Sequence, residues 1–178
     1  MLAFICIFAL SFAQEISTPE YIHGPILFDI IKKDVLFKKE AEYNISIIYN
    51  DNEDDSIDNM NRIKYCFKDL NNAFIKVGYK IIITEIPFQS KGAFYSAMDN
   101  NKIKLVYLCS DLDKKTIQKI NDITQELNIL TTTGSEELFE YGASISVSIK
   151  NTSSAELISN KNDIIKVRNL SFYNSIKD

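Results

Sequence analysis

Apolar residues along the chain are concentrated in short segments separated by stretches with helical spacing. The short apolar-rich segments indicate strands at Tyr43–Tyr49, Tyr79–Ile86, Ile103–Cys109 and Ile129–Thr133. Between these segments, apolar residues recur every three or four positions over 56–76, 90–100 and 117–127, which is the spacing of one helix face. Because strands that alternate with helices form parallel βαβ units, the pattern predicts a parallel sheet with helices on its faces.

The last third of the chain follows a different pattern. Ser135–Tyr141 is expected to form a short helix that ends at Gly142. Ala143–Lys150 alternates apolar and polar residues, and Ser154–Ser159 follows a turn, so we expect an antiparallel hairpin at the sheet edge. Asn162–Val167 is expected to be a short helix. The predicted fold class is α/β, a three-layer doubly wound sandwich of about four parallel strands plus an antiparallel edge hairpin.

The N-terminus indicates export. Residues 1–13 (MLAFICIFALSFA) are apolar and uncharged, have the length of a signal-peptide core, and end in small residues that favour cleavage near Ala13. The alternative is a buried N-terminal strand or helix. Residues 14–42 are expected to form an arm and a helix, and residues 43–178 a single domain. With the leader removed, the protein would work outside the cytoplasm.

Charge and composition exclude several functions. The chain has 178 residues, a net charge of −4 and no basic run, so nucleic acid is not an expected partner. Its single histidine is His23, on which any Ser/His, Cys/His or histidine-rich metal site would depend. Glycine-rich phosphate loops and a Gly-x-Ser-x-Gly elbow are absent. We therefore expect no catalytic residue, no resident metal and no cofactor.

Polar residues follow the predicted strands, where a parallel sheet places its binding sites. A helix N-terminus rich in hydroxyl groups can hold an anion, although Glu136 and Glu137 would repel one, and a simple helix cap is the alternative. The candidate ligand-binding residues are Asn50, Ser110, Thr131, Thr132, Thr133, Gly134 and Ser135.

Three acidic or sulfur-containing features have simpler interpretations. Residues 50–55 (NDNEDD) carry four carboxylates but lack the central glycine of a calcium loop, so a solvated loop is expected. Asp111 or Asp113 could add carboxylates to the same rim, but a helix cap is the simpler role. Cys66 and Cys109 could pair in an oxidising compartment, yet their apolar surroundings favour buried thiols.

Several segments resemble the YfiR-like family of secreted bacterial proteins. These are VYLCSDLD at Val106–Asp113, ILTTTGSEELFEYGASISVSI at Ile129–Ile149, and ELISN at Glu156–Asn160. The resemblance covers roughly Tyr43 to Phe172. It implies a single-domain periplasmic α/β fold similar to one lobe of a periplasmic binding protein, without catalytic residues. It also implies protein–protein contact with the sensor part of a membrane diguanylate cyclase.

Two functions follow as hypotheses. The first is a non-enzymatic periplasmic regulator that acts by contact with a membrane-bound sensor, as a monomer or a homodimer. The second is a binding protein of the transporter substrate-binding type, with a small anionic ligand on the rim formed by Asn50, Ser110 and Thr131–Ser135.

Overall fold

The computed structural model describes residues 42–75, 78–151, 154–161 and 164–171. The predicted signal peptide and the helix predicted within residues 14–42 lie outside these residues. Within them the elements, in chain order, are β1 (Glu42–Tyr49), α2 (Asp54–Ile75), β2 (Lys80–Pro87), α3 (Lys91–Asn100), β3 (Leu105–Leu108), α4 (Lys114–Glu126), β4 (Leu130–Thr133), α5 (Glu136–Glu140), β5 (Ile145–Asn151), β6 (Ser154–Lys161) and β7 (Ile164–Ser171).

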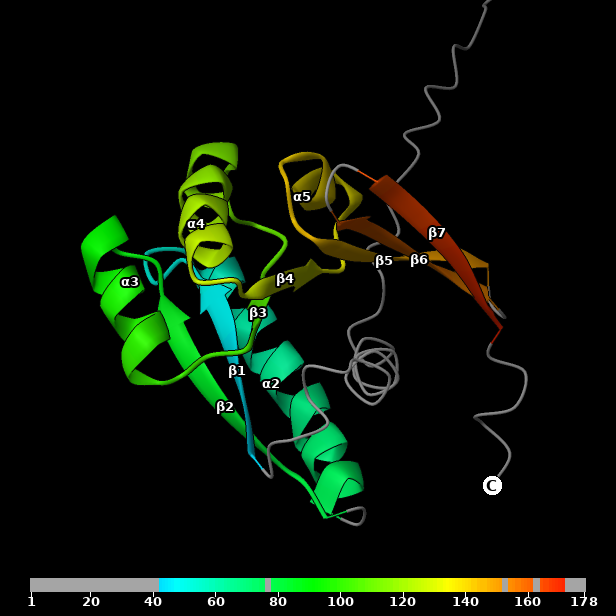
Figure 1. Ribbon diagram of the computed structural model, residues 1–178, viewed down its shortest axis with the longest axis horizontal. Coiled ribbons are helices and arrows are strands. Elements are labelled where there is room, and N and C mark those ends of the chain that lie inside the picture. Colours follow the sequence, from blue (N-terminus) through cyan, green and yellow to red (C-terminus); the bar gives the residue numbers. More distant parts are fainter. Residues whose placement is uncertain (1–41, 76–77, 152–153, 162–163, 172–178) are drawn as a thin grey trace, which may run out of the picture.

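The strands form one sheet in the order β2-β1-β3-β4-β5-β6-β7 (Figure 1). Strands β2, β1, β3, β4 and β5 pair in parallel, whereas β6 and β7 are antiparallel to their neighbours. The α/β sandwich with a parallel sheet predicted from the apolar runs is therefore confirmed. It has five parallel strands rather than about four, because β5 pairs with β4 in parallel.

One predicted element is wrong. Residues 162–167 were expected to form a short helix, but Ile164–Ser171 is strand β7, which pairs with β6 over its whole length. Ile164, Ile165 and Val167 are β-branched, a residue type whose stiff side chain favours a strand when a partner strand is beside it. The composition of residues 164–171 alone does not show whether a partner strand is present, and here β6 provides it.

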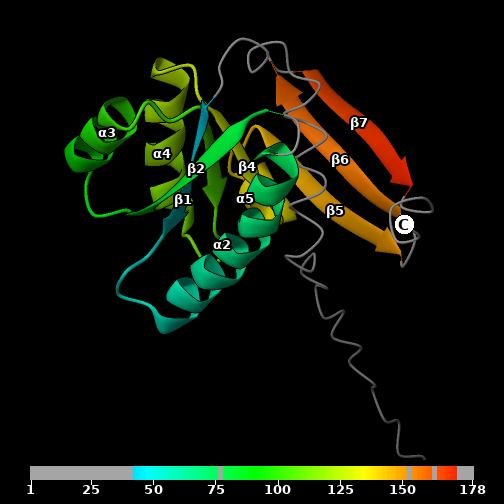
Figure 2. The ribbon, with the colours of Figure 1, turned by 90° about the horizontal axis from the view of Figure 1, so that it is seen from below.

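Two apolar cores lie on opposite faces of the sheet, and Figure 2 shows the corresponding layers, with α2 on one face and α3 and α4 on the other. The first core joins α2 to residues such as Ile45, Ile47 and Tyr107. The second joins α3 and α4 to residues such as Ile48 and Leu108. Adjacent residues Ile47 and Ile48 face opposite cores, so β1 is apolar on both sides, as a central parallel strand requires.

Candidate functional site

The sheet has a topological switch point between β1 and β3. From β1 the chain moves through α2 to β2 on one side, and from β2 it crosses through α3 to β3 on the other side of β1. The segments that leave β1 and β3 at their carboxyl ends therefore diverge. In open α/β sheets this divergence leaves a crevice in which ligands bind.

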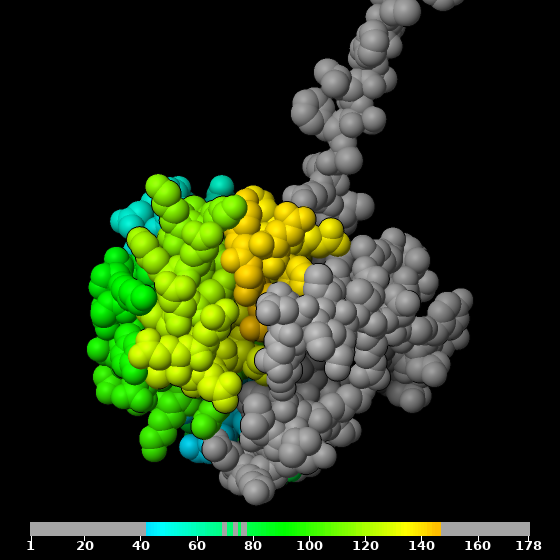
Figure 3. Space-filling model, turned by 45° about the horizontal axis from the view of Figure 1, so that its top comes forward, coloured from blue at the N-terminus to red at the C-terminus, as the bar shows by residue number. Residues whose placement is uncertain are grey.

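A cavity of about 410 Å³ occupies this position. Figure 3, with the carboxyl edge turned toward the viewer, shows α4 (yellow-green) flanked by α3 (green) and by the α5 region (yellow to orange). The lining residues come from the loop after β1 and the start of α2, from the loop after β2, and from the turn between β3 and α4 with the first turn of α4. They are Asn50, Glu53, Asp55, Phe88, Asp111, Leu112, Asp113 and Thr116.

Hydrogen bonds hold the loop after β1 in place. The Asn50 backbone N–H donates to the buried Ser56 hydroxyl at 2.8 Å, and the Asn52 N–H donates to Asn50 Oδ1 at 3.1 Å. Gln89 Nε2, from the segment after β2, donates to Asp51 Oδ2 at 3.0 Å. These contacts join the first two loops of the rim, so one wall of the cavity is built before any ligand arrives.

Asp113 caps helix α4, as one of the two sequence interpretations proposed. Its Oδ1 accepts from the N–H groups of Lys115 at 2.8 Å and Thr116 at 3.1 Å, and its Oδ2 accepts from the Thr116 hydroxyl at 2.7 Å. The hydrogen bond from the Thr116 side chain is the main reason that the pKa of Asp113 is lowered from its usual 3.8. The carboxylate is thus fixed in its charged form at the cavity wall.

Replacing Asp113 with alanine is expected to reduce the free energy of unfolding by about 0.5–2 kcal/mol, because the first turn of α4 loses its acceptor. Since the folded-state pKa is lowered, this contribution is complete above the ordinary pKa and disappears as pH falls through the folded-state value. Urea unfolding at pH 7 and below pH 4 measures both effects. Asp111→Ala removes a nearby exposed carboxylate and serves as the control; an equal loss there would contradict the capping role.

The cavity is acidic. Glu53, Asp55, Asp111 and Asp113 line it, and among the lining residues there is no lysine or arginine. Burial is the main cause of the raised pKa of nearby Tyr49, with further contributions from Asp51 and Glu85. No group of three or more His, Cys, Asp or Glu side chains within the described ranges has the geometry to hold a metal ion. The arrangement suits a positively charged organic group, with Phe88 and Leu112 as its apolar wall.

The predicted hydroxyl cluster lies mostly inside the fold. Thr131, Thr132 and Thr133 on β4 are each 1% exposed. The Thr133 hydroxyl donates to the Leu108 carbonyl at 3.2 Å and accepts from the Ser135 N–H at 3.1 Å. Ser135 caps α5 through Leu138 N–H at 3.3 Å. These hydroxyl groups satisfy backbone groups around β4, which is what the helix-cap alternative expected of Ser135.

Of the predicted ligand-binding residues, only Asn50 lines the cavity. Ser110 is exposed in the turn after β3, and residues 131–135 are not among the lining residues. An anion site at these positions stays a prediction. Sequence reasoning missed Glu53, Asp55, Phe88 and Leu112 as site residues. Their place in the sequence could have identified them, because each follows the carboxyl end of β1, β2 or β3.

Cys66 and Cys109, the cysteines within the described ranges, are thiols and do not form a disulfide. Cys66 is half-buried in α2, and Cys109 is buried directly after β3. The Cys109 side chain belongs to the core between α2 and the sheet. Its position is consistent with the apolar surroundings on which the thiol interpretation was based.

The comparisons with known proteins give structural matches only. No family model and no curated protein matches the sequence, so membership of the YfiR-like family stays a prediction. Among solved structures, the chain is similar to a conserved domain protein from Vibrio cholerae, with a TM-score of 0.50 and 17% identity over 75% of this chain and 40% of that one.

Two further structures resemble this chain less closely. A periplasmic ribose ABC transporter protein from Conexibacter woesei has a TM-score of 0.46 and 9% identity over 74% of this chain and 46% of that one. A ligand-free, open substrate-binding protein with adhesive properties from Clostridium difficile has a TM-score of 0.45 and 20% identity over 71% of this chain and 39% of that one. The chain spans less than half the length of these proteins, and the likeness to the Vibrio cholerae protein shows the fold alone.

Proposed function

We propose that this protein is a binding module for a small organic cation, such as an amine, which it holds in the cavity at the carboxyl edge of its parallel sheet. The observation that carries this proposal is the coincidence of the cavity with the switch point between β1 and β3. The proposal keeps the binding-protein hypothesis drawn from the sequence. It changes the expected ligand from an anion to a cation, because carboxylates line the cavity.

Electrostatics favours that ligand class. Four carboxylates line the cavity without a lysine or arginine among the lining residues, so they disfavour an anion and attract an ammonium group. Phe88 offers a ring face on which a cation or an apolar stem can rest. Asp113 accepts its hydrogen bonds from α4, so Glu53, Asp55 and Asp111 are the carboxylates that we expect to contact the ligand.

A thermal-shift titration of the full chain with spermidine, and with succinate as the anionic counterpart, tests the proposal. Spermidine at a hundredfold excess over its Kd should add about 2.7 kcal/mol to the free energy of unfolding and raise Tm. Succinate should not. In Asp111→Asn, which removes charge with little change in size, the spermidine shift should shrink markedly.

Asp99→Asn is the matched control. Asp99 is an exposed carboxylate near the end of α3, which runs opposite to the strands, so it lies at the amino edge of the sheet. Loss of this charge should leave the spermidine shift unchanged. A spermidine shift of equal size in both variants, or none in the unaltered protein, would contradict binding of a polyamine in this cavity.

The narrower hypotheses rest on the sequence. We infer a non-enzymatic role, because the chain offers no nucleophile and base that can be paired.

Export through residues 1–13 and regulation of a membrane diguanylate cyclase in the manner of the YfiR-like family remain predictions. Helices within the described part of the chain are all too short or too polar to span a bilayer. If the mature protein captured a diguanylate cyclase from membranes and spermidine abolished this capture, the result would support both the regulator hypothesis and the cation-binding hypothesis.

A further inference from the structure

Strand β2 is an edge of the sheet, and a groove runs beside it. In the described part of the chain, β2 pairs only with β1. The groove, of about 470 Å³, lies between this edge and one face of helix α2. From α2 it is lined by residues that include Lys64, Tyr65, Lys68 and Asn71, and from β2 by Ile81 and Ile83. It is separate from the acidic cavity, with which it shares no residue.

The backbone of β2 presents a short window of hydrogen-bonding groups to this groove. The Phe88 N–H donates to Tyr49 on β1, so alternate residues toward the start of β2 also face β1. The residues between them, Ile81, Ile83 and Glu85, direct their N–H groups outward. Proline at position 87 has no N–H, which closes the window at one end.

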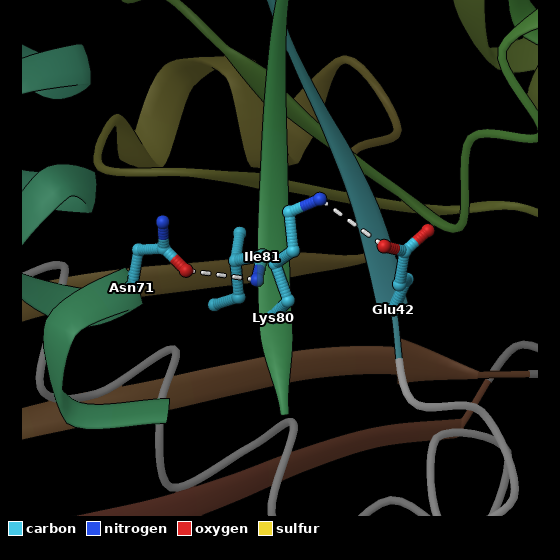
Figure 4. A network of polar contacts seen from close by, with 4 residues as sticks. All are labelled: Glu42, Asn71, Lys80 and Ile81. Carbon is cyan, nitrogen blue, oxygen red and sulfur yellow. Dashed lines mark hydrogen bonds and ion pairs between the residues drawn. The ribbon is translucent and has the colours of Figure 1, made fainter. Parts of the chain in front are cut away.

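Asn71 closes the other end. Its Oδ1 accepts from the Ile81 N–H at 2.9 Å, and Figure 4 shows this side chain reaching from α2 to the strand. The outward donors that remain between Asn71 and Pro87 are those of Ile83 and Glu85. A short extended segment can therefore pair with the middle of β2, whereas a long strand would collide with Asn71.

The helix side of the groove indicates the chemistry of a partner. Tyr65 is 70% exposed, and Ile75, on the same face of α2, is 56% exposed. Lys64 is paired with Glu85 at 2.5 Å, whereas Lys68 makes no ion pair among the described residues. No carboxylate lines the groove, although the chain as a whole has a net charge of −4. The groove thus offers apolar area together with an unpaired positive charge.

We propose that this groove binds a short, extended acidic peptide segment of a partner protein, which adds to β2 as an extra strand. Its backbone pairs with Ile83 and Glu85, its apolar side chains contact Tyr65, and its carboxylate pairs with Lys68. A second copy of this chain fits less well. Twofold pairing of two β2 strands would place the Lys68 side chains of both copies at one interface without an added carboxylate, because Glu85 is already paired with Lys64 in each copy.

The probe for this proposal is the acetylated, amidated hexapeptide Val-Ser-Glu-Ser-Val-Ser, which places its valine and glutamate side chains on one face of the strand. It is titrated into the full chain, and its valine–lysine counterpart has lysine in place of the glutamate. Amide NMR signals of Ile83 and Glu85 should shift most, and affinity should exceed that of the valine–lysine counterpart at least ~10-fold. A hexapeptide N-methylated on the edge that faces β2 keeps its side chains but loses the backbone hydrogen bonds, and it should not bind.

Two charge-reversal variants test where on the protein the peptide binds. Lys68→Glu should weaken the valine–glutamate peptide at least ~10-fold, whereas Lys91→Glu, on α3, should not. Asp111→Asn should also leave peptide binding intact, which separates this surface from the cavity. Equal binding of the two peptides, tight binding of the N-methylated form, or a homodimer dispersed by Ile83→Pro would overturn the proposal.

Discussion

Phe67→Ala is expected to reduce the free energy of unfolding by about 3–5 kcal/mol, the range for removing a buried aromatic side chain. Phe67 lies in the middle of α2 with its side chain fully buried against the sheet. Its ring meets Tyr107 of β3 edge to face, with centroids 5.6 Å apart and planes at 86°. The substitution therefore removes apolar contact, an aromatic pair and the volume that fills the first core.

Tyr65→Ala is the matched control, two residues away on the same helix. Because the Tyr65 side chain is 70% exposed, its loss should change the free energy of unfolding by no more than about 0.5 kcal/mol. Urea unfolding of the full chain measures both variants. Where Phe67→Ala leaves too little folded protein, Phe67→Leu should show a smaller loss of about 1–2 kcal/mol. Similar values at positions 65 and 67 would mean that α2 is not packed on the sheet as described.

The strands and helices of the parallel part follow from local sequence. Strand β1 carries buried isoleucines on both of its faces, at Ile45, Ile47 and Ile48, because helices cover the sheet on both sides. A segment this rich in β-branched apolar residues indicates a buried strand. Helix α4 has apolar residues at 117, 120 and 123, all buried. Strand β7 differs, since its apolar residues suit a helix or a strand equally and the pairing with β6 decides between them.

The candidate site depends on strand order, which local sequence does not encode. Glu53, Asp55 and Asp111 share one cavity because β1 and β3 are neighbours, although β2 separates them in the chain. From the sequence alone, residues 50–55 have the composition of a solvated loop. The threonines at 131–133 were predicted to bind a ligand, but the structure shows hydroxyl groups of this segment bonding within the fold. A hydroxyl can bind a ligand or satisfy a backbone group, and only the register with β3 and β5 shows that the second occurs.

Gly142→Ala is the second substitution with a large expected effect, a loss of about 2–3 kcal/mol. Gly142 connects α5 to β5 with a φ of +113°, a conformation that side chains with a Cβ avoid at a cost of about 1–2 kcal/mol. An added Cβ would also lie 2.8 Å from Asn121 Nδ2. That amide donates to the Tyr141 carbonyl at 3.2 Å, so it cannot withdraw without breaking a hydrogen bond between α4 and the α5–β5 turn.

Two other glycines separate the contributions to this loss. Gly78→Ala carries the strain of a positive φ (+87°) with open space around the added Cβ, so it should cost only about 1–2 kcal/mol. Gly92→Ala, in the first turn of α3 with open space and no positive φ, should stabilise by about 0.5–1 kcal/mol. Adding Asn121→Ala to Gly142→Ala should relieve the clash, and chemical unfolding of both single variants and the double variant would measure that coupling. Strictly additive losses would show that the contact with Asn121 is not what excludes a side chain at position 142.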